Sequence, residues 1–290
     1  MATGLPFMTK RLNNILDKSL ENNDLIESYL SIQISLDGFS FAVYDSRLEK
    51  YLAWSYYTLE LPQKTPEKLL EALEGIYQEN NLLNHAYKKV VVVHQNNLSC
   101  LVPNNYFEEA HMKTYLEQNV KVLPNDFISH DPLKNTPTNV VYIPFVNLNN
   151  FFFSKYGTFD FFHASSIVID QLIKKYKADK ETKMFVNASG AHIEILVLKE
   201  GSLTFYNSFE AATANDFLYY TLFAMEQLNL DPETIETVLL GTLTEASEAF
   251  TLAYKYIRNL RLYSEENPKL TNAFESLPKQ SNFALFHLFS

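Results

Sequence analysis

One pattern of residues occurs twice in this 290-residue sequence, and it constrains the fold more than any other feature. In the second occurrence, the apolar residues 184–186 precede a polar turn at residues 187–192, and residues 193–198 follow as another apolar segment. A Glu-Gly turn then leads into residues 203–207. Short apolar segments separated by polar, glycine-containing turns are typical of β-hairpins. This stretch therefore predicts three consecutive strands.

The first occurrence lies 154 residues earlier. Residues 31–35 run into a Leu-Asp-Gly turn, and residues 39–44 follow as the next strand. The constant spacing pairs Ile32 with Val186. An internal duplication of a strand-turn-strand-strand unit, each copy followed by a helix, predicts two lobes of similar fold. A chain of this length is large enough to give each lobe its own core.

Composition excludes several classes of protein. Hydrophobic residues make up 47% of the chain and there is no low-complexity segment, which predicts a folded protein. The net charge of −10 and the dispersed Lys and Arg residues oppose binding to a phosphate backbone, so no nucleic-acid partner is expected. Cys100 is the only cysteine, which excludes an intramolecular disulfide and a thiolate zinc cage. The chain begins without the pattern of a secretory signal and no apolar run approaches ~18 residues, so we expect a cytoplasmic protein without membrane insertion.

The first half of the chain predicts an N-terminal arm and one lobe. Residues 1–28 are polar with a weak amphipathic set of apolar residues, and they predict a loose arm or a peripheral helix. Lobe one, of the ribonuclease H-like type, is expected to span residues 29–147. Its predicted strands are residues 30–35, 39–44, 51–59, 90–93 and 140–146, and its predicted helices are one that begins at Thr65 and Pro66 and one at residues 107–116.

Residues 148–178 are predicted to connect the lobes. The helix expected at residues 161–176 has apolar residues around most of its circumference, so it should cross between the lobes and be buried on more than one side. Lobe two, also ribonuclease H-like, is expected to span residues 179–290. After its three strands, it should contain helix 213–228, strand 237–240, helix 244–256, strand 257–263 and short segments at 270–274 and 283–289.

Two copies of the order strand-strand-strand-helix-strand-helix-strand resemble the actin-like ATPase superfamily, which includes sugar kinases, heat-shock chaperones and actin. Residues 184–209 are similar to the phosphate-binding hairpin of its pilus-assembly and secretion-system members. Residues 30–44, which contain a Ser-Leu-Asp-Gly-Phe-Ser turn, resemble an uncharacterised bacterial family of this fold. The resemblance implies a two-lobed α/β fold of the ribonuclease H-like type, with duplicated mixed five-stranded sheets flanked by helices. It extends over nearly the whole chain after residue 28.

The resemblance also implies where a nucleotide would bind. In the superfamily, the first hairpin of each lobe supplies an aspartate for Mg²⁺ or the attacking water, and a glycine that lets backbone N–H groups approach the phosphates. Here the aspartate positions hold Gln33 and Asn187, and the glycine positions hold Ser35 and Ser189. An amide is neither a charged Mg²⁺ ligand nor a base, and a side chain at the glycine position crowds the phosphate.

Five further residues complete these degenerate phosphate and nucleotide loops. If the pairing is shifted, Asp37 and Gly38 occupy the loop of lobe one, but the loop of lobe two at Gly190 still lacks an acid. The adenosine-side loop of such folds carries a pair of glycines, of which this chain keeps Gly241, followed by Thr242. A nucleotide cradle requires several glycines and the whole chain has seven. We therefore expect neither ATP nor Mg²⁺ as a cofactor.

Other polar residues give weaker patterns. His192 and Glu194 should point to one face of their strand, either as a catalytic pair or as a solvated pair at a strand edge. His94 ends a predicted strand, where open α/β sheets place ligand-contacting residues, and residues 95–97 are amides; the alternative is a polar turn. No histidines have metal-binding spacing, so no metal site is predicted.

The sequence thus favours a cytoplasmic pseudo-ATPase that acts by binding a protein partner, without catalytic residues of its own. Its 18 tyrosines and 22 phenylalanines are consistent with an interaction surface, because aromatic residues are enriched at interfaces. The alternative explanation, which is the stronger one for any single residue, is that they fill aromatic-rich cores and an interlobe seam. The alternative function is that of a divergent nucleotide-dependent kinase or ATPase that uses the interlobe cleft.

Overall fold

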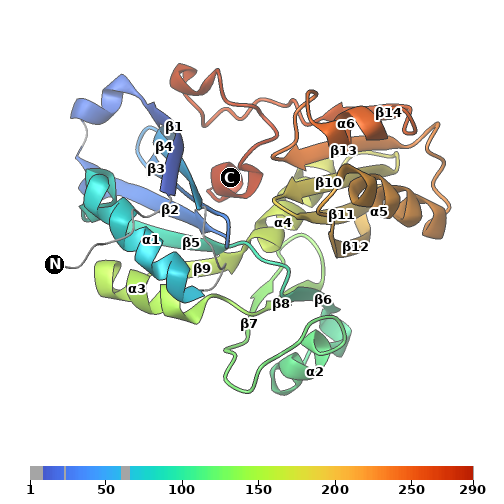
Figure 1. Cartoon of the computed structure of the whole chain (residues 1–290), viewed down its shortest axis with the longest axis horizontal. Coiled ribbons are helices and arrows are strands. Elements are labelled where there is room, and N and C mark those ends of the chain that lie inside the picture. Colours follow the sequence, from blue (N-terminus) through green and yellow to red (C-terminus); the bar gives the residue numbers. More distant parts are fainter. Residues whose placement is uncertain (1–8, 23, 60–65, 290) are drawn as a thin grey trace.

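The computed structural model describes residues 9–22, 24–59 and 66–289. Two α/β lobes lie side by side, with α4 (Ala164–Tyr176) between them and a small subdomain below (Figure 1). Over the described residues, no helix is long and apolar enough to cross a membrane.

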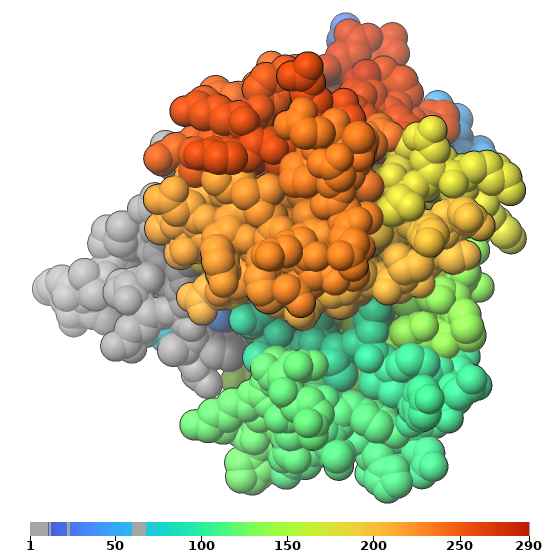
Figure 2. All heavy atoms as spheres, turned by 90° about the vertical axis from the view of Figure 1, so that its right-hand side faces the viewer, coloured from blue at the N-terminus to red at the C-terminus, as the bar shows by residue number. Residues whose placement is uncertain are grey.

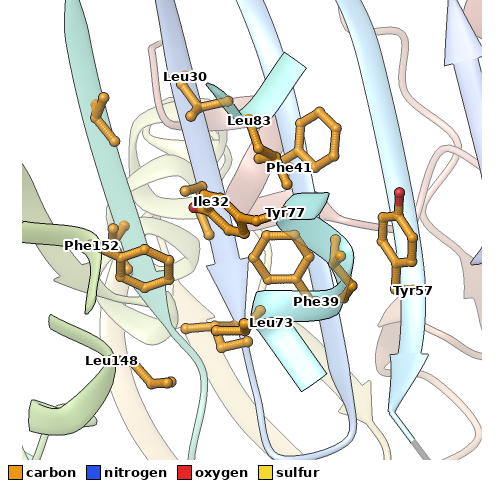
Figure 3. Close-up of a cluster of buried hydrophobic side chains, with 14 of the residues drawn as sticks. Leu30, Ile32, Phe39, Phe41, Tyr57, Leu73, Tyr77, Leu83, Leu148 and Phe152 are labelled. Carbon is orange, nitrogen blue, oxygen red and sulfur yellow. The ribbon is translucent and has the colours of Figure 1, made fainter. Parts of the chain in front are cut away.

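The sheet of lobe one has six strands in the order β1-β4-β3-β2-β5-β9. These strands are β1 (Thr9–Leu16), β2 (Ser28–Ile34), β3 (Gly38–Asp45), β4 (Lys50–Leu59), β5 (Lys89–His94) and β9 (Asp160–His163). Helices α1 (Pro66–Glu79) and α3 (Val146–Tyr156) cover one face, where residues such as Phe39, Leu73 and Phe152 form the core (Figure 3). Every residue of β3 is buried, because the other face is covered as well.

Lobe two has a five-stranded sheet in the order β12-β11-β10-β13-β14. Its elements are β10 (Lys183–Ser189), β11 (His192–Lys199), β12 (Ser202–Glu210), α5 (Ala214–Gln227), β13 (Glu236–Gly241), α6 (Glu248–Ala253) and β14 (Asn259–Leu262). Helices α5 and α6 pack on one face and α4 on the other. A capping box at Thr213 and Asp216 fixes the start of α5.

The two sheets have the same core topology. In lobe one, β2 is antiparallel to β3 and parallel to β5. In lobe two, β10 is antiparallel to β11 and parallel to β13. Ile32 lies opposite Phe41 on β3, and Val186 lies opposite Ile195 on β11. Ile32 and Val186 therefore occupy equivalent positions in the two central strands, as their spacing predicted.

The fifth strand of lobe one is not the predicted one. Residues 140–146 were expected there, but β8 (Thr138–Tyr142) is the middle strand of a separate sheet with the order β6-β8-β7. Val140 and Val141 face two different cores, so the segment has the apolar character of an interior strand in either sheet. The strand that pairs with β5 in its place is β9. The sequence had predicted the two phenylalanines of β9 to begin the following helix.

The small sheet belongs to a subdomain inserted between β5 and α3. It contains β6 (Ser99–Pro103), β7 (Ser129–Pro132), β8 and the short helix α2 (Met112–Leu116). The predicted helix at residues 107–116 is thus α-helical only over its last five residues. Cys100 is buried in this subdomain, and burial raises the pKa of its thiol to about 11, as suits an inert core residue.

The N-terminal arm also differs from the expectation of a loose or helical segment. Within the described residues, β1 pairs antiparallel with β4 and adds a sixth strand to lobe one. Asn14 Oδ1 accepts a hydrogen bond of 2.7 Å from Ser55 Oγ across this pair. The open edge of β4 supplies backbone partners, and these decide the conformation against the weak helical pattern.

Helix α4 crosses between the lobes as predicted, although it starts at Ala164 rather than at residue 161. Its buried residues contact both lobes, and Ile169 is completely buried. The C-terminal helix α7 (Phe283–His287) packs between the lobes as well (Figure 1). Phe283 joins the core around α4, whereas Leu285 and Phe286 pack on the sheet of lobe one. The short 3-10 helices are Lys18–Asn22, Leu25–Glu27, Asn81–Asn84, Asn104–Tyr106, Glu109–His111 and Asn272–Phe274.

Candidate functional site in the interlobe cleft

The first hairpins of the two lobes meet in the cleft. The β2–β3 turn holds Asp37 and the β10–β11 turn holds Gly190, which has a φ of +56°. A Cβ atom built on Gly190 would lie 2.2 Å from Asp37 Oδ2. The carboxylate of lobe one therefore lies against the backbone of the equivalent turn in lobe two.

Two cavities adjoin this contact. The larger, about 670 Å³, is lined by all nine residues that the sequence singled out: Gln33, Ser35, Asp37, Gly38, Asn187, Ser189, Gly190, Gly241 and Thr242. The smaller, about 140 Å³, is lined by residues 95–97, which lead into the subdomain, and by residues of lobe two. Figure 2 shows lobe two lying over the subdomain. Asp37 and Asn187 line both cavities. Residues far apart in the sequence are thus brought together by the fold.

In lobe one, the side chain at the aspartate position is tied to a neighbouring strand end. Gln33 Nε2 donates a hydrogen bond to Gln95 Oε1, and Gln33 Oε1 is buried without a hydrogen-bond partner. Ser35 Oγ donates to Asp37 Oδ1 over 2.7 Å. These contacts fix the turn without any basic residue.

In lobe two, Glu194 organises the equivalent position. Asn187 Nδ2 donates to Glu194 Oε2 over 2.7 Å, and Glu194 Oε1 accepts hydrogen bonds from Tyr206 OH, at 2.7 Å, and from Ser165 Oγ. Burial, and next the nearby Glu194, raise the pKa of Tyr206 well above its usual value, so the phenol stays a donor. The amide at the former aspartate position is thus engaged with a carboxylate of its own lobe.

Gly241 is required by the fold itself. Its φ is +91°, and a Cβ atom there would lie 1.9 Å from the carbonyl oxygen of Ala188. Thr242 N donates to that same oxygen over 2.9 Å, while Gly241 N donates to Gln280 O over 2.8 Å. The predicted adenosine-side loop is therefore packed against β10 and against the C-terminal segment.

His94 is a structural residue of the lobe-one core. It is fully buried, its Nε2 lies 2.9 Å from Asn149 Oδ1, and its Nδ1 accepts from Phe145 N. Burial lowers its pKa to about 3, so it is neutral. His94 lines neither cavity, whereas the amide residues that follow it, Gln95, Asn96 and Asn97, line the smaller one.

A buried polar network fixes the start of α4 against the subdomain. Asp131 accepts hydrogen bonds from His163 N at 2.8 Å, Ser166 Oγ at 2.6 Å and Tyr142 OH at 3.0 Å. Burial raises the pKa of Asp131 to about 6 and lowers that of His163 to about 4. The His163 ring also lines the smaller cavity.

Sequence reasoning placed some neighbours correctly and missed others. His192 and Glu194 do lie on one face and both line the smaller cavity, but β11 is an interior strand, so they are not an edge pair. Ser165 and Tyr206 lie inside a helix and a strand, where nothing in the sequence indicates a site. Residues from the C-terminal segment reach the larger cavity only through long-range packing; they are Leu277, Pro278, Ser281, Asn282, Phe283 and Ala284.

The donor set does not match a nucleotide with its metal. Among the described residues that line the two cavities there is no Lys or Arg. Within the same described part of the chain, no three His, Cys, Asp or Glu residues are grouped to hold a metal ion. Amides at positions 33 and 187 offer Mg²⁺ no charge, and phosphates would meet Asp37 without a compensating cation.

Comparisons with known proteins give the fold and a family. The profile of a protein family of unknown function, DUF3822, matches residues 17–260. A Bacteroides thetaiotaomicron protein with an actin-like ATPase fold and unknown function is 23% identical, with a TM-score of 0.74 over 90% of this chain and 96% of that one. PilM of the PilM–PilN type IV pilus biogenesis complex is 12% identical, with a TM-score of 0.55 over 91% and 97% of the two chains. No curated protein has significant sequence similarity. The chain therefore has the actin-like ATPase fold that its repeated hairpins predicted.

Proposed function

The chain belongs to the protein family DUF3822, and we propose that it is a non-catalytic member of the actin-like fold that acts by binding a protein partner in the cytoplasm. The observation that carries this proposal is the state of the two former aspartate positions. The side chain of Gln33 is hydrogen-bonded to Gln95, and that of Asn187 is hydrogen-bonded to Glu194. Phosphoryl transfer depends on charge and positioning, and these amides provide neither for a metal ion.

A protein partner is favoured by two further observations. PilM, which shares the fold, forms a complex with PilN. In this chain, Tyr219 and Phe223 stack on the exposed face of α5, with Tyr219 61% exposed. Exposed aromatic pairs of this kind are typical of interaction surfaces. Duplication of one ancestral lobe would explain the shared topology of the two sheets.

Phosphate release from ATP tests the proposal. We expect purified protein with Mg-ATP to stay at background, and Gln33→Ala and Asn187→Ala to behave as wild type. Steady Mg²⁺-dependent release that disappears in either variant would establish the alternative, a divergent kinase or ATPase. Binding is checked by thermal unfolding, because a ligand at 100 times its dissociation constant stabilises a protein by about 2.7 kcal/mol.

The partner is sought by affinity capture from native lysate. Tyr219→Ala with Phe223→Ala should lose the captured protein, whereas Tyr106→Ala, at an exposed aromatic of the subdomain, should retain it. Capture that is unaffected by the α5 variant would place the interaction elsewhere on the molecule.

A further inference from the structure

The smaller cavity of the cleft is acidic and has no basic residue in its wall. Its lining includes the carboxylates of Asp37 and Glu194, together with amides, serines and two histidines. Among the described residues, neither carboxylate forms a salt bridge. Negative charge that converges on a small cavity, without an internal cation, attracts cations and repels anions.

Buried polar atoms are also left without hydrogen-bond partners beside this cavity. His192 lines the smaller cavity, and its Nδ1 atom is buried with no partner. Gln33 Oε1, in the adjoining larger cavity, is buried without a partner as well. Buried polar atoms in folded proteins are normally paired, and both of these atoms can accept a hydrogen bond from a bound donor.

We propose that the smaller cavity binds a guanidinium group, with Asp37 as its charged partner and Glu194 and His192 as further acceptors. A guanidinium is planar, carries five N–H donors and no acceptor, and pairs with carboxylates in a fixed geometry. Glu194 already accepts three hydrogen bonds, from Asn187, Tyr206 and Ser165, whereas the carboxylate of Asp37 accepts one within the described residues, from Ser35, so Asp37 is the carboxylate with fewer partners. The volume of about 140 Å³ suits such a group and not a nucleotide.

Calorimetric titration with a matched pair of ligands tests this inference. Butylguanidinium and butylurea have the same shape and differ in charge. We expect millimolar butylguanidinium to bind, and butylurea to bind at least about 10-fold more weakly. Asp37→Asn, which keeps the shape of the side chain, should weaken butylguanidinium by at least about 10-fold, whereas Glu226→Gln on the exposed face of α5 should have no effect.

Several outcomes would overturn the inference: equal affinity for the two ligands, no binding of butylguanidinium, or binding unchanged in both Asp37→Asn and Glu194→Gln. Thermal stabilisation by Mg²⁺ with none from butylguanidinium would replace it with a metal site. A Gly-Arg-Gly peptide with both termini blocked identifies the source of the guanidinium group. Tighter binding of this peptide than of butylguanidinium assigns the group to a polypeptide. Tighter binding of butylguanidinium assigns it to a free small molecule. None of these results depends on whether ATP is hydrolysed, so the site and the proposed function can fail separately.

Discussion

The carboxylate of Asp37 in lobe one lies against the backbone of Gly190 in lobe two, so closely that a Cβ atom at position 190 would be 2.2 Å from Oδ2. The two residues come from equivalent turns of equivalent hairpins. Their contact joins the two lobes, and a side chain at position 190 would collide with the carboxylate.

Gly190→Ala should therefore destabilise the protein by about 1–2 kcal/mol, because the positive φ disfavours a side chain and Asp37 must move away. Urea denaturation measures the change. Gly75→Ala is the control: no atom lies within 4 Å of the new Cβ, and alanine in the interior of α1 should stabilise by about 0.5–1 kcal/mol. An unchanged Gly190→Ala would mean that the two turns do not touch in solution.

Ile169→Asp should unfold the whole protein rather than one lobe. The residue is fully buried in a core that α4 shares with both lobes, and an unpaired buried charge there costs more than about 4 kcal/mol. Circular dichroism should show loss of native structure at 25 °C. Lys174→Asp, at an exposed position of the same helix, should retain it. Ile169→Asp with the melting temperature of wild type would contradict the position of α4.

Phe286→Ala should destabilise by about 3–5 kcal/mol. The ring is 2% exposed and meets Tyr51 edge-on, with the ring centres 5.2 Å apart, so truncation leaves a cavity between α7 and the sheet of lobe one. Chemical denaturation gives the free energy of unfolding. Tyr254→Ala removes a ring that is 60% exposed and should change that free energy by less than about 0.5 kcal/mol. Equal effects of the two substitutions would show that α7 is not docked.

Stability should decrease as the pH falls from 7 to 5. Burial lowers the pKa of His94 to about 3 and that of His163 to about 4, so below pH 6.5 the unfolded chain binds more protons than the folded one. Each of these two histidines then lowers the free energy of unfolding by about 2 kcal/mol between pH 7 and pH 5. Asp131 acts in the opposite direction: with a pKa raised to about 6, it favours the folded state as the pH falls toward 4 and contributes about 1 kcal/mol at pH 5.

Unfolding free energies measured at pH 7 and pH 5 check this balance. His94→Gln keeps a donor toward Asn149 and should reduce the loss by about 2 kcal/mol. His85→Gln, at an exposed position, should leave the pH dependence of wild type unchanged. A steeper loss in His94→Gln than in wild type would mean that His94 is charged in the folded protein.

Local patterns in the sequence determined the repeated unit, the order of elements in lobe two and the order of elements in lobe one from β2 to β5. The 154-residue spacing placed Ile32 and Val186 on equivalent central strands, because a strand-turn-strand unit has its pattern in a few consecutive residues. The resemblance to actin-like ATPases singled out nine loop residues, and all nine line the larger cavity. Crossing of α4 between the lobes also followed from its apolar circumference.

Tertiary structure alone decided which sheet each strand joins and how the cleft is closed. Val140 and Val141 are buried whichever sheet contains β8, and β1 became a strand because β4 had a free edge. The contacts of Gln33 with Gln95, and of Glu194 with Ser165 and Tyr206, join residues from separate elements. Local sequence patterns cannot indicate such pairs, because these hydrogen bonds form only after folding has brought distant residues together.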